Sequence, residues 1–409
     1  MRSLRILSVL AMAIFALYGC SNSGSNPVLP PLSAVTLNIH SDSVKVNGSI
    51  QFTATAYDLS SHPVPGATFA WNTSDASVFT VTNTGRVTGK GEGTAWLYAA
   101  TGGLIDSASV LVLPATGGWF VQTSNSTAQL NSVFFQSDAR NGCAVGSAGE
   151  ILTTGDAGTT WTRRVSNTSF NLNSVKFVSA TEGWAVGGNG TAVHTTDAGV
   201  TWAVVLTGAS ENLIDVCFAT PDTGWAVGAN GVIIRSFDHG GTWSIVHPTA
   251  NTLNGVSFAG TLDGWAVGNG GVVLGTHDRG DTWFIVQPSL TTQPLRRVWR
   301  RSEPMAVAVG AAGTVLRSYA GADSTTWELD NAGAANSLEG VMFLTSTHGW
   351  AVGANGTGIV LETLDGGVTW QPQTAPAANP LRGVYFVDAL RGWVVGDNGR
   401  ILHTGTGGQ

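Results

Sequence analysis

Four arginines stand close together in one short segment of this chain. Residues 295–301 read LRRVWRR, and the cations are Arg296, Arg297, Arg300 and Arg301. Glu339 and Arg382 each follow a leucine, as Arg296 does, at successive intervals of 43 residues. Guanidinium groups hold carboxylates through paired hydrogen bonds, so these six residues could bind an acidic peptide or another carboxylate. The alternative is a ladder of salt bridges among Arg296, Glu339 and Arg382 that serves only the fold.

The other polar residues form no pattern that points to catalysis or to a metal. Five aspartates stand in stretches that read [TS]-x-D-x-G-x-T-W: Asp156, Asp197, Asp238, Asp278 and Asp365. Such carboxylates accept backbone N–H bonds within a hairpin, and the glycine takes a positive φ, so a local structural role is expected. His194 and His403 occupy equivalent places in repeats that are not neighbours. We expect no catalytic residue, no metal site and no cofactor.

A unit of about 42 residues repeats after residue 116, which is typical of repeat architectures. Its fullest form is a hydrophobic strand, GWAVG, a glycine turn, an apolar strand and the aspartate stretch. The units open at Leu130, Leu172, Leu213, Leu253, Leu295, Leu338 and Leu381. The last unit stops before its closing tryptophan, and residues 117–122 match the strand that it lacks. Residues 117–409 are therefore predicted to form a seven-bladed β-propeller closed by its N-terminal strand, with Cys143 and Cys217 as free thiols in non-adjacent units.

The beginning of the chain has the features of an export signal followed by an anchor. Arg2 and Arg5 precede a short apolar run, too short to span a bilayer, so residues 1–19 are predicted to be a signal peptide. The end of the run, LYGC, resembles the bacterial lipobox, which implies a lipid anchor at Cys20. Residues 20–32 are rich in serine, glycine, asparagine and proline and are expected to form a flexible tether. The resemblance implies a lipoprotein of the cell envelope, with Ser21 indicating the outer membrane.

Residues 33–114 contain short alternating strands and are predicted to be a separate all-β module. The sequences WNTS from Trp71, TGRVTG from Thr84 and GTA from Gly93 resemble the group 2 bacterial immunoglobulin-like domains. This resemblance implies an immunoglobulin-like β-sandwich that acts as a spacer.

The repeat after residue 116 resembles the photosystem II stability and assembly factor family, on the strength of GWAVG-x-N-G-x-I-L joined to the aspartate stretch, or Asp-box. The resemblance implies a non-catalytic protein that holds a polypeptide partner on one propeller face, with arginines at the contact. Sialidases also combine propellers with Asp-boxes, but their chemistry needs a tyrosine nucleophile beside a carboxylate. Tyr385 stands three residues from Arg382, and in a regular strand this odd spacing is expected to turn the two to opposite faces.

Composition narrows the classes of partner. Charged residues make up only 11% of the 409 residues and the net charge is −7, which excludes an electrostatic nucleic-acid binder. The 54 glycines favour tight turns between short strands, hence an all-β chain. The sequence therefore predicts an exported, lipid-anchored, non-catalytic scaffold that binds a polypeptide. A cell-surface adhesin that binds glycan is the alternative, and a sialidase-like glycoside hydrolase is a further one.

Overall fold

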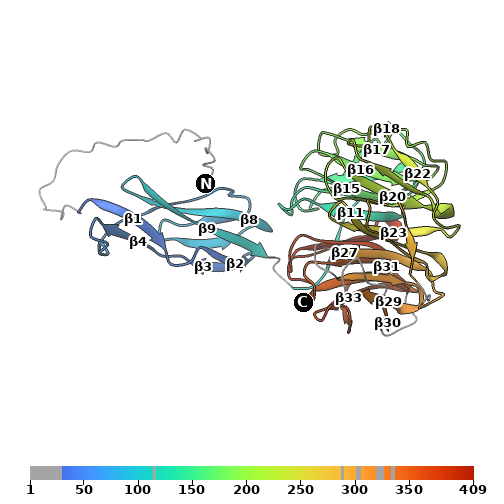
Figure 1. The fold of residues 1–409 in the computed structure, drawn as a ribbon. Helices are drawn as coiled ribbons and strands as arrows, with labels where there is room; N and C mark the ends of the chain where they lie inside the picture. The colour runs from blue at the N-terminus through green and yellow to red at the C-terminus, as the bar shows by residue number, and fades with distance from the viewer. Residues whose placement is uncertain (1–29, 114–116, 287–289, 301–304, 319–326, 333–336) are drawn as a thin grey trace, which may run out of the picture.

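The computed structural model of the protein describes residues 30–113, 117–286, 290–300, 305–318, 327–332 and 337–409 (Figure 1). Arg301, Cys20, the expected signal peptide and residues 20–29 of the expected tether lie outside the described residues. Within the described ranges the regular structure is β-strand, apart from the single 3₁₀ turns η1 (Ser147–Gly149), η2 (Ala229–Gly231), η3 (Asn269–Gly271), η4 (Ala311–Gly313) and η5 (Asp397–Gly399). This confirms the all-β prediction. Over the same ranges, no helix has the length and apolar character needed to cross a membrane.

Nine strands form the first module, which covers residues 32–113. They are β1 (Leu32–Leu37), β2 (Ser41–Lys45), β3 (Ser49–Gln51), β4 (Ala54–Asp58), β5 (Ala70–Thr73), β6 (Phe79–Val81), β7 (Arg86–Gly89), β8 (Gly93–Thr101) and β9 (Leu104–Leu113). They pair as β1-β4, β2-β9-β8-β5 and β3-β7-β6, and β2 runs parallel to β9. Alternate residues of β8 are buried, as expected for a sheet with one face on a core. That core includes the fully buried Phe52, Phe79 and Leu97.

Seven four-stranded antiparallel sheets make up the described part of residues 117–409. We number them in chain order as sheet 1, β11 (Leu130–Phe135), β12 (Gly142–Gly146), β13 (Ile151–Thr154) and β14 (Thr162–Arg164); sheet 2, β15 (Leu172–Phe177), β16 (Gly183–Gly187), β17 (Ala192–Thr195) and β18 (Ala203–Val205); sheet 3, β19 (Leu213–Phe218), β20 (Gly224–Gly228), β21 (Ile233–Ser236) and β22 (Ser244–Val246); sheet 4, β23 (Leu253–Ala259), β24 (Asp263–Gly268), β25 (Val273–Thr276) and β26 (Phe284–Ile285); sheet 5, β27 (Leu295–Arg300), β28 (Ala306–Gly310), β29 (Thr314–Ser318) and β30 (Glu328–Asn331); sheet 6, β31 (Ser337–Phe343), β32 (Gly349–Asn355), β33 (Thr357–Thr363) and β34 (Gln371–Gln373); and sheet 7, β35 (Leu381–Phe386), β36 (Gly392–Gly396), β37 (Ile401–Thr404) and β10 (Phe120–Gln122).

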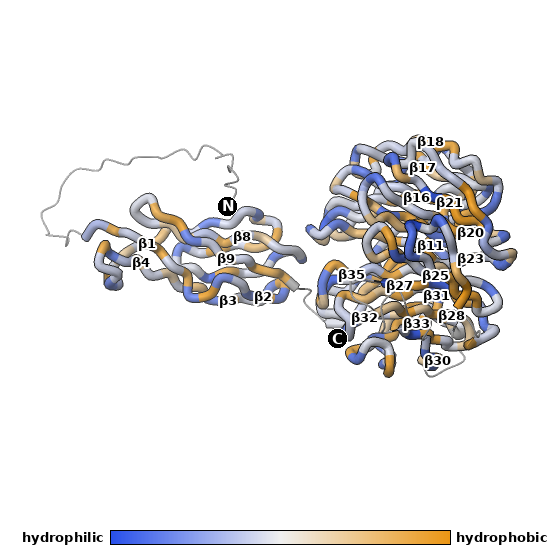
Figure 2. The backbone as a smooth tube through the Cα atoms, viewed as in Figure 1, coloured by the Kyte–Doolittle hydropathy of each residue, from blue (hydrophilic) through white to orange (hydrophobic). Residues whose placement is uncertain are grey.

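The first strand of each sheet is the innermost one, and these seven strands surround an axis. Each contacts the first strand of the next sheet, and β35 contacts β11, so the ring returns to its start. β10 pairs with β37, which places the beginning and end of this region in one sheet. Hydrophobic stretches follow the strands (Figure 2). The arrangement is that of a β-propeller.

Tryptophan and phenylalanine fill the space between sheets. Trp225 of β20 stacks on Phe258 of the next sheet with ring centroids 3.5 Å apart, and Trp350 stacks on Phe386 at 3.6 Å. The first glycine of each GWAVG strand makes room for the phenylalanine of its own sheet, since a Cβ on Gly224 would lie 2.4 Å from the Phe218 ring. The repeated motif is thus explained by packing. Cys143 of β12 and Cys217 of β19 are free thiols.

Among the described residues, three polar contacts join the first module to sheets 1 and 7. Arg140 Nη1 lies 2.7 Å from Asp75 Oδ2, and Arg391 Nη1 donates to Thr94 Oγ1 at 3.3 Å. His403 Nδ1 lies 3.2 Å from Glu92 Oε2, and burial lowers the pKa of His403 to about 4. Arg140 and Arg391 lie in the turns that follow β11 and β35, so the module contacts the propeller face where the innermost strands end (Figure 1).

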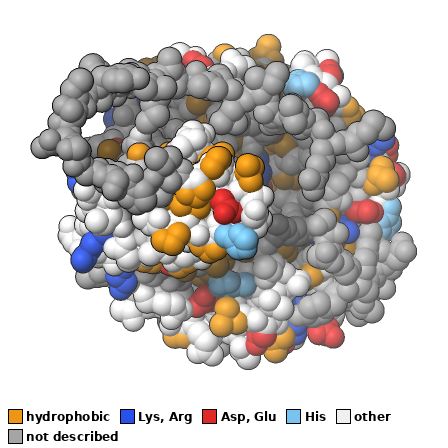
Figure 3. Space-filling model, turned by 90° about the vertical axis from the view of Figure 1, so that its left-hand side faces the viewer, with side chains coloured by type: hydrophobic (Ala, Val, Ile, Leu, Met, Phe, Trp, Pro, Cys, Tyr) orange, Lys and Arg blue, Asp and Glu red, His pale blue; other side chains and the backbone are white. Residues whose placement is uncertain are grey.

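The opposite end of the first module points away from the propeller. β8 runs from this contact to Thr101, and a Cβ on the next residue, Gly102, would lie 3.1 Å from the Leu32 side chain. Leu32, where β1 begins, is therefore at the far end. Hydrophobic side chains gather on that end (Figure 3), where Leu59 and Ile105 are 78% and 65% exposed.

Candidate binding mouth of the central channel

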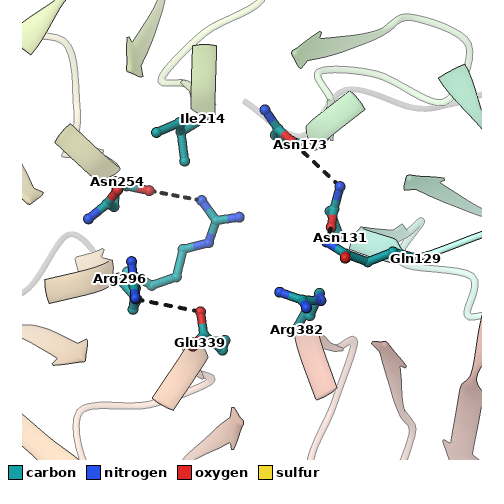
Figure 4. Close-up of a pocket in the computed structure, with 9 residues that line it drawn as sticks. Gln129, Asn131, Asn173, Ile214, Asn254, Arg296, Glu339 and Arg382 are labelled. Atoms are coloured by element: carbon teal, nitrogen blue, oxygen red, sulfur yellow. Dashed lines mark hydrogen bonds and ion pairs between the residues drawn. The ribbon is translucent and has the colours of Figure 1, made fainter. Parts of the chain in front are cut away.

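The residue that follows each opening leucine lies at one mouth of the central channel. These seven residues are Asn131, Asn173, Ile214, Asn254, Arg296, Glu339 and Arg382, and with Gln129 and Arg297 they line a cavity of 220 Å³. We call the seven the mouth ring. Figure 4 shows Arg296, Glu339 and Arg382 along one side of the cavity, across from Ile214 and Asn173. The mouth lies at the start of the innermost strands, whereas the first module contacts the propeller where those strands end.

A β-bulge turns each of these side chains towards the axis. In all seven sheets the pairing between the first two strands shifts directly after the leucine, for example between Leu295 and Arg297. The residue in between, here Arg296, has no pairing partner on the second strand, and bulges commonly re-aim a side chain in this way. The leucine itself is fully buried in every unit.

The three asparagines of the mouth ring tie neighbouring sheets together. The Nδ2 of Asn131 donates to the carbonyl of Leu172 at 2.9 Å, that of Asn173 to Leu213 at 2.7 Å, and that of Asn254 to Leu295 at 2.7 Å. Each bond joins one inner strand to the next. The asparagine side of the mouth is therefore held by internal hydrogen bonds, whereas the charged members stand in sheets 5 to 7 and sheet 3 contributes Ile214.

The structure brings Arg296, Glu339 and Arg382 together but forms only half of the expected ladder. Arg296 Nε lies 3.7 Å from Glu339 Oε2, and this nitrogen has no hydrogen-bond partner within the described residues. Arg382 pairs instead with Asp397 of its own sheet, with Nε to Oδ1 at 2.5 Å and Nη2 to Oδ2 at 3.2 Å. A guanidinium has five N–H donors, so both arginines keep donors that these contacts do not use.

Arg297 turns into the channel and forms an internal ion pair. Its Nη1 lies 2.8 Å from Asp215 Oδ1, two sheets away, and the two side chains are 19% and 12% exposed. On the intervening sheet the same Nη1 donates to the Asn254 carbonyl at 3.2 Å, and Gly255 lets the two inner strands approach, because a Cβ there would lie 2.9 Å from the Arg297 Cα. Arg297 touches the mouth cavity, but its charge is already balanced inside the protein.

Arg300 lies at the other end of β27 and does not line the mouth cavity. It pairs with Ala306 as Phe135 pairs with Gly142, so the strand keeps its register and the guanidinium occupies the place of a phenylalanine. Its Nε and Nη1 are buried without hydrogen-bond partners within the described residues. Burial lowers the pKa of Arg300, and Asp263 opposes the shift. The length of β27 thus separates Arg300 from Arg296 and the mouth cavity, and Arg301 lies outside the described residues.

Comparison with known proteins assigns the propeller to a family. The sequence model described as Photosynthesis system II assembly factor YCF48 matches residues 115–210, 201–311 and 319–409. The chain belongs to this family. No curated protein matches the chain.

Solved structures similar to this YCF48-family chain share its fold. YCF48 from Cyanidioschyzon merolae is 20% identical with a TM-score of 0.59, over 70% of this chain and 98% of that one. YCF48 bound to D1 peptide is 22% identical with a TM-score of 0.57, over 71% and 96%. The RRP9 WD40 repeats are 8% identical with a TM-score of 0.60, over 72% and 98%. At these identities the likeness shows the propeller fold.

Sequence reasoning missed most of the mouth ring of this YCF48-family chain. Counting one residue past the leucine in sheets 5 to 7 found the three charged members, and the same count in the other sheets gives the remaining four, Asn131, Asn173, Ile214 and Asn254. The ring was therefore readable from the repeat register. The repeat register gave no indication that Asp215 and Asp397 pair with Arg297 and Arg382.

The Asp-boxes of this YCF48-family chain are structural turns. Asp197 accepts hydrogen bonds from the amide and hydroxyl of Thr201 and from the hydroxyl of Thr195. The Thr201 bonds lower the pKa of Asp197 to about 2. Since the folded pKa is below the usual 3.8, this stabilisation is fully present above about pH 4 and is lost as the pH falls towards 2. Within the described residues, no group of His, Cys, Asp and Glu could hold a metal.

Proposed function

We propose that this chain is an exported, lipid-anchored, non-catalytic scaffold that binds a segment of polypeptide at the mouth of a seven-bladed propeller closed by its own ends. The observation that carries the proposal is the mouth ring, in which the ion pair of Arg296 among the described residues is a 3.7 Å contact to Glu339. The side chains of Arg296 and Glu339 are 36% and 25% exposed, so a ligand can reach them.

The chemistry of the mouth suits a segment that carries carboxylates. Arg296 and Arg382 offer guanidinium donors, which grip carboxylates in a fork geometry. Gln129 and the asparagines line the same cavity, and amide oxygens suit the N–H groups of a peptide backbone, whereas the asparagine Nδ2 groups already donate to the neighbouring strands. The YCF48 in the solved complex is bound to a D1 peptide, and this likeness supports a polypeptide as the class of partner here.

The order of the parts along the chain suits presentation away from a membrane. We propose that Cys20 carries the lipid and that the first module is an immunoglobulin-like spacer. The tether would then join the spacer near Leu32, at the end remote from the propeller. The mouth opens on the propeller face opposite the one that the spacer contacts. An anchored molecule would thus direct its mouth outward, in keeping with an outer-membrane site in the cell envelope.

Charge reversal at the mouth tests the polypeptide proposal. We expect Arg296→Glu/Arg382→Glu to lose one specific polypeptide, by about ten-fold or more, in a crosslinking pulldown from the native envelope. The physical reason is that the reversed mouth repels carboxylates and leaves Asp397 unpaired. The measurement is quantitative mass spectrometry of the captured proteins.

The matched control is Arg86→Glu/Lys90→Glu, which changes the charge equally at exposed positions of the first module. This control is expected to keep the partner. If the partner list is the same for both variants, the mouth is structural, and binding to a glycan array would then support the adhesin alternative.

The lipid anchor has a separate test. We expect Cys20→Ser to lose the lipid and to leave the membrane fraction, because serine offers no thiol for acylation. Mass spectrometry and fractionation of intact cells measure both. A variant that still carries lipid or stays in the membrane fraction would show that Cys20 is not the anchor.

A further inference from the structure

A second cavity continues from the mouth into the channel. Its volume is 180 Å³, and it shares Asn131 and Arg297 with the mouth cavity. Beyond the mouth ring its wall carries residues four past the opening leucines, namely Phe134, Lys176, Trp299, Met342 and Tyr385. The wall thus combines aromatic and apolar side chains with Lys176 and with the internal ion pair of Asp215 and Arg297.

Lys176 is a cation in the channel wall without an ion-pair partner within the described residues. The carboxylate of Asp215 is already occupied, because it accepts bonds from Arg297, from the Ser174 hydroxyl and from the Val256 amide. The Lys176 ammonium lies 5.3 Å from the centre of the Phe134 ring and 6.0 Å from that of Tyr385. Burial lowers the pKa of Lys176, and Cys217 and Asp215 oppose the shift. Ring faces compensate a buried cation only in part, so an anion beside Lys176 would stabilise the site.

We propose that the channel binds a carboxylate carried on a small apolar or aromatic body, with the carboxylate on Lys176 Nζ. Phe134, Trp299, Met342 and Tyr385 enclose the apolar body. Burial raises the pKa of Tyr385 to about 12, so its hydroxyl stays protonated and can donate to the same carboxylate. Pockets of this kind combine apolar walls with few polar groups, and those groups fix the ligand's orientation.

The way in leads past the mouth ring. An anion that enters meets Arg296 and Arg382 before it reaches Lys176, and cationic groups in a narrow opening raise the local concentration of anions. The carboxylate has two possible sources, a free organic acid or the acidic end or side chain of the polypeptide proposed for the mouth. The site itself rests on Lys176 and its surroundings, so it does not depend on the proposed polypeptide partner.

Ligand binding to the full chain in detergent micelles tests the site, with benzoate as probe and benzamide as its uncharged counterpart. We expect the wild type to bind benzoate about ten-fold or more tightly than benzamide, because a charge-assisted hydrogen bond to Lys176 is worth this difference. Lys176→Met is expected to lose the preference. Lys45→Met, the same change at an exposed residue of the first module, is expected to keep it.

Benzoate binding and polypeptide capture together distinguish the two sources of the carboxylate, a free organic acid and an acidic group of the polypeptide. Loss of the benzoate preference in Lys176→Met with unchanged polypeptide capture would indicate a free acid as the ligand. A wild type that does not bind benzoate, together with loss of the captured polypeptide in Lys176→Met, would indicate a carboxylate of that polypeptide. The proposal is overturned if the wild type shows no preference for benzoate and Lys176→Met captures polypeptide as the wild type does. The benzoate and benzamide comparison on the wild type decides the free-acid case even if Lys176→Met fails to fold. If Arg296→Glu/Arg382→Glu still captured the polypeptide, the polypeptide proposal would fail, but the benzoate preference of the wild type would still support the channel site.

Discussion

Asp215→Ala is expected to destabilise the propeller by about 3–5 kcal/mol, which is typical when one partner of a buried ion pair is removed. Asp215 Oδ1 accepts a bond from Ser174 Oγ at 2.8 Å and lies 2.8 Å from Arg297 Nη1, and Oδ2 accepts the Val256 amide at 3.1 Å. Its partners belong to sheets 2, 4 and 5, so one carboxylate links four sheets around the axis. Without it, the Arg297 cation stays in the channel with its charge unbalanced. Urea unfolding followed by tryptophan fluorescence measures the loss.

Two further variants make this result specific. Asp215→Ala/Arg297→Met removes both charges and is expected to recover much of the lost stability, since replacing a whole buried pair is often close to neutral. Asp222→Ala removes a half-exposed carboxylate from a turn of the same sheet and is expected to cost about 1 kcal/mol or less. Equal unfolding midpoints for Asp215→Ala and Asp222→Ala would contradict a central role for the Asp215–Arg297 pair.

Trp225→Ala is expected to cost about 3–5 kcal/mol, as for other fully buried tryptophans. The ring is fully buried, stacks on Phe258 at 3.5 Å, and donates its Nε1 hydrogen to the Arg279 carbonyl at 2.8 Å. Alanine would leave a large cavity between sheets 3 and 4 and an unpaired carbonyl. The same urea experiment measures the effect on the propeller transition.

Trp96→Ala is the matched control for this change. Trp96 lies on β8 of the first module and is 50% exposed, so its truncation removes little buried surface. We expect its effect to be much smaller than that of Trp225→Ala. A propeller that loses no more stability from Trp225→Ala than from Trp96→Ala would show that tryptophan stacking is not what holds the sheets together.

The sequence predicted the parts of the fold that depend on the repeat register. The opening leucines, such as Leu130 and Leu381, are fully buried, and the Asp-box carboxylates bond within their own turns, as Asp197 does with Thr201. In sequence, residues 117–122 match the strand that the last unit lacks. In the structure, β10 of this segment pairs with β37 of the last unit. These features depend on residue type and on position within one repeat unit. They can therefore be predicted from a single sequence.

The contacts of long charged side chains could not be predicted in the same way. Arg382 was expected to reach Glu339 in the preceding unit, but it pairs with Asp397, which the turn η5 places beside it. Arg297 reaches across a whole sheet to Asp215, and on the way its Nη1 donates to the Asn254 carbonyl of that sheet. An arginine side chain has several carboxylates within reach, and the choice depends on bulges and on small residues elsewhere in the ring.

The lysine of the channel went unnoticed for a related reason. In sequence, Lys176 is the one charged residue in the segment LNSVKF and looks like an ordinary solvated lysine. Its significance appears only when Phe134 and Tyr385 from two other sheets lie beside it. Such a neighbourhood is created by closure of the ring, since sheets 1 and 7 are far apart in the chain.

Site-specific photocrosslinking in the native envelope tests the central claim, that the mouth binds a polypeptide, most directly. A photoreactive residue at Ile214, an uncharged member of the mouth ring, leaves the arginines in place, and one at Leu206, which is 91% exposed outside the mouth, serves as the reference. The account predicts that Ile214 crosslinks to one polypeptide, that Leu206 does not, and that Arg296→Glu/Arg382→Glu abolishes the product. Crosslinks that are absent at Ile214, or equal at both positions, would contradict it.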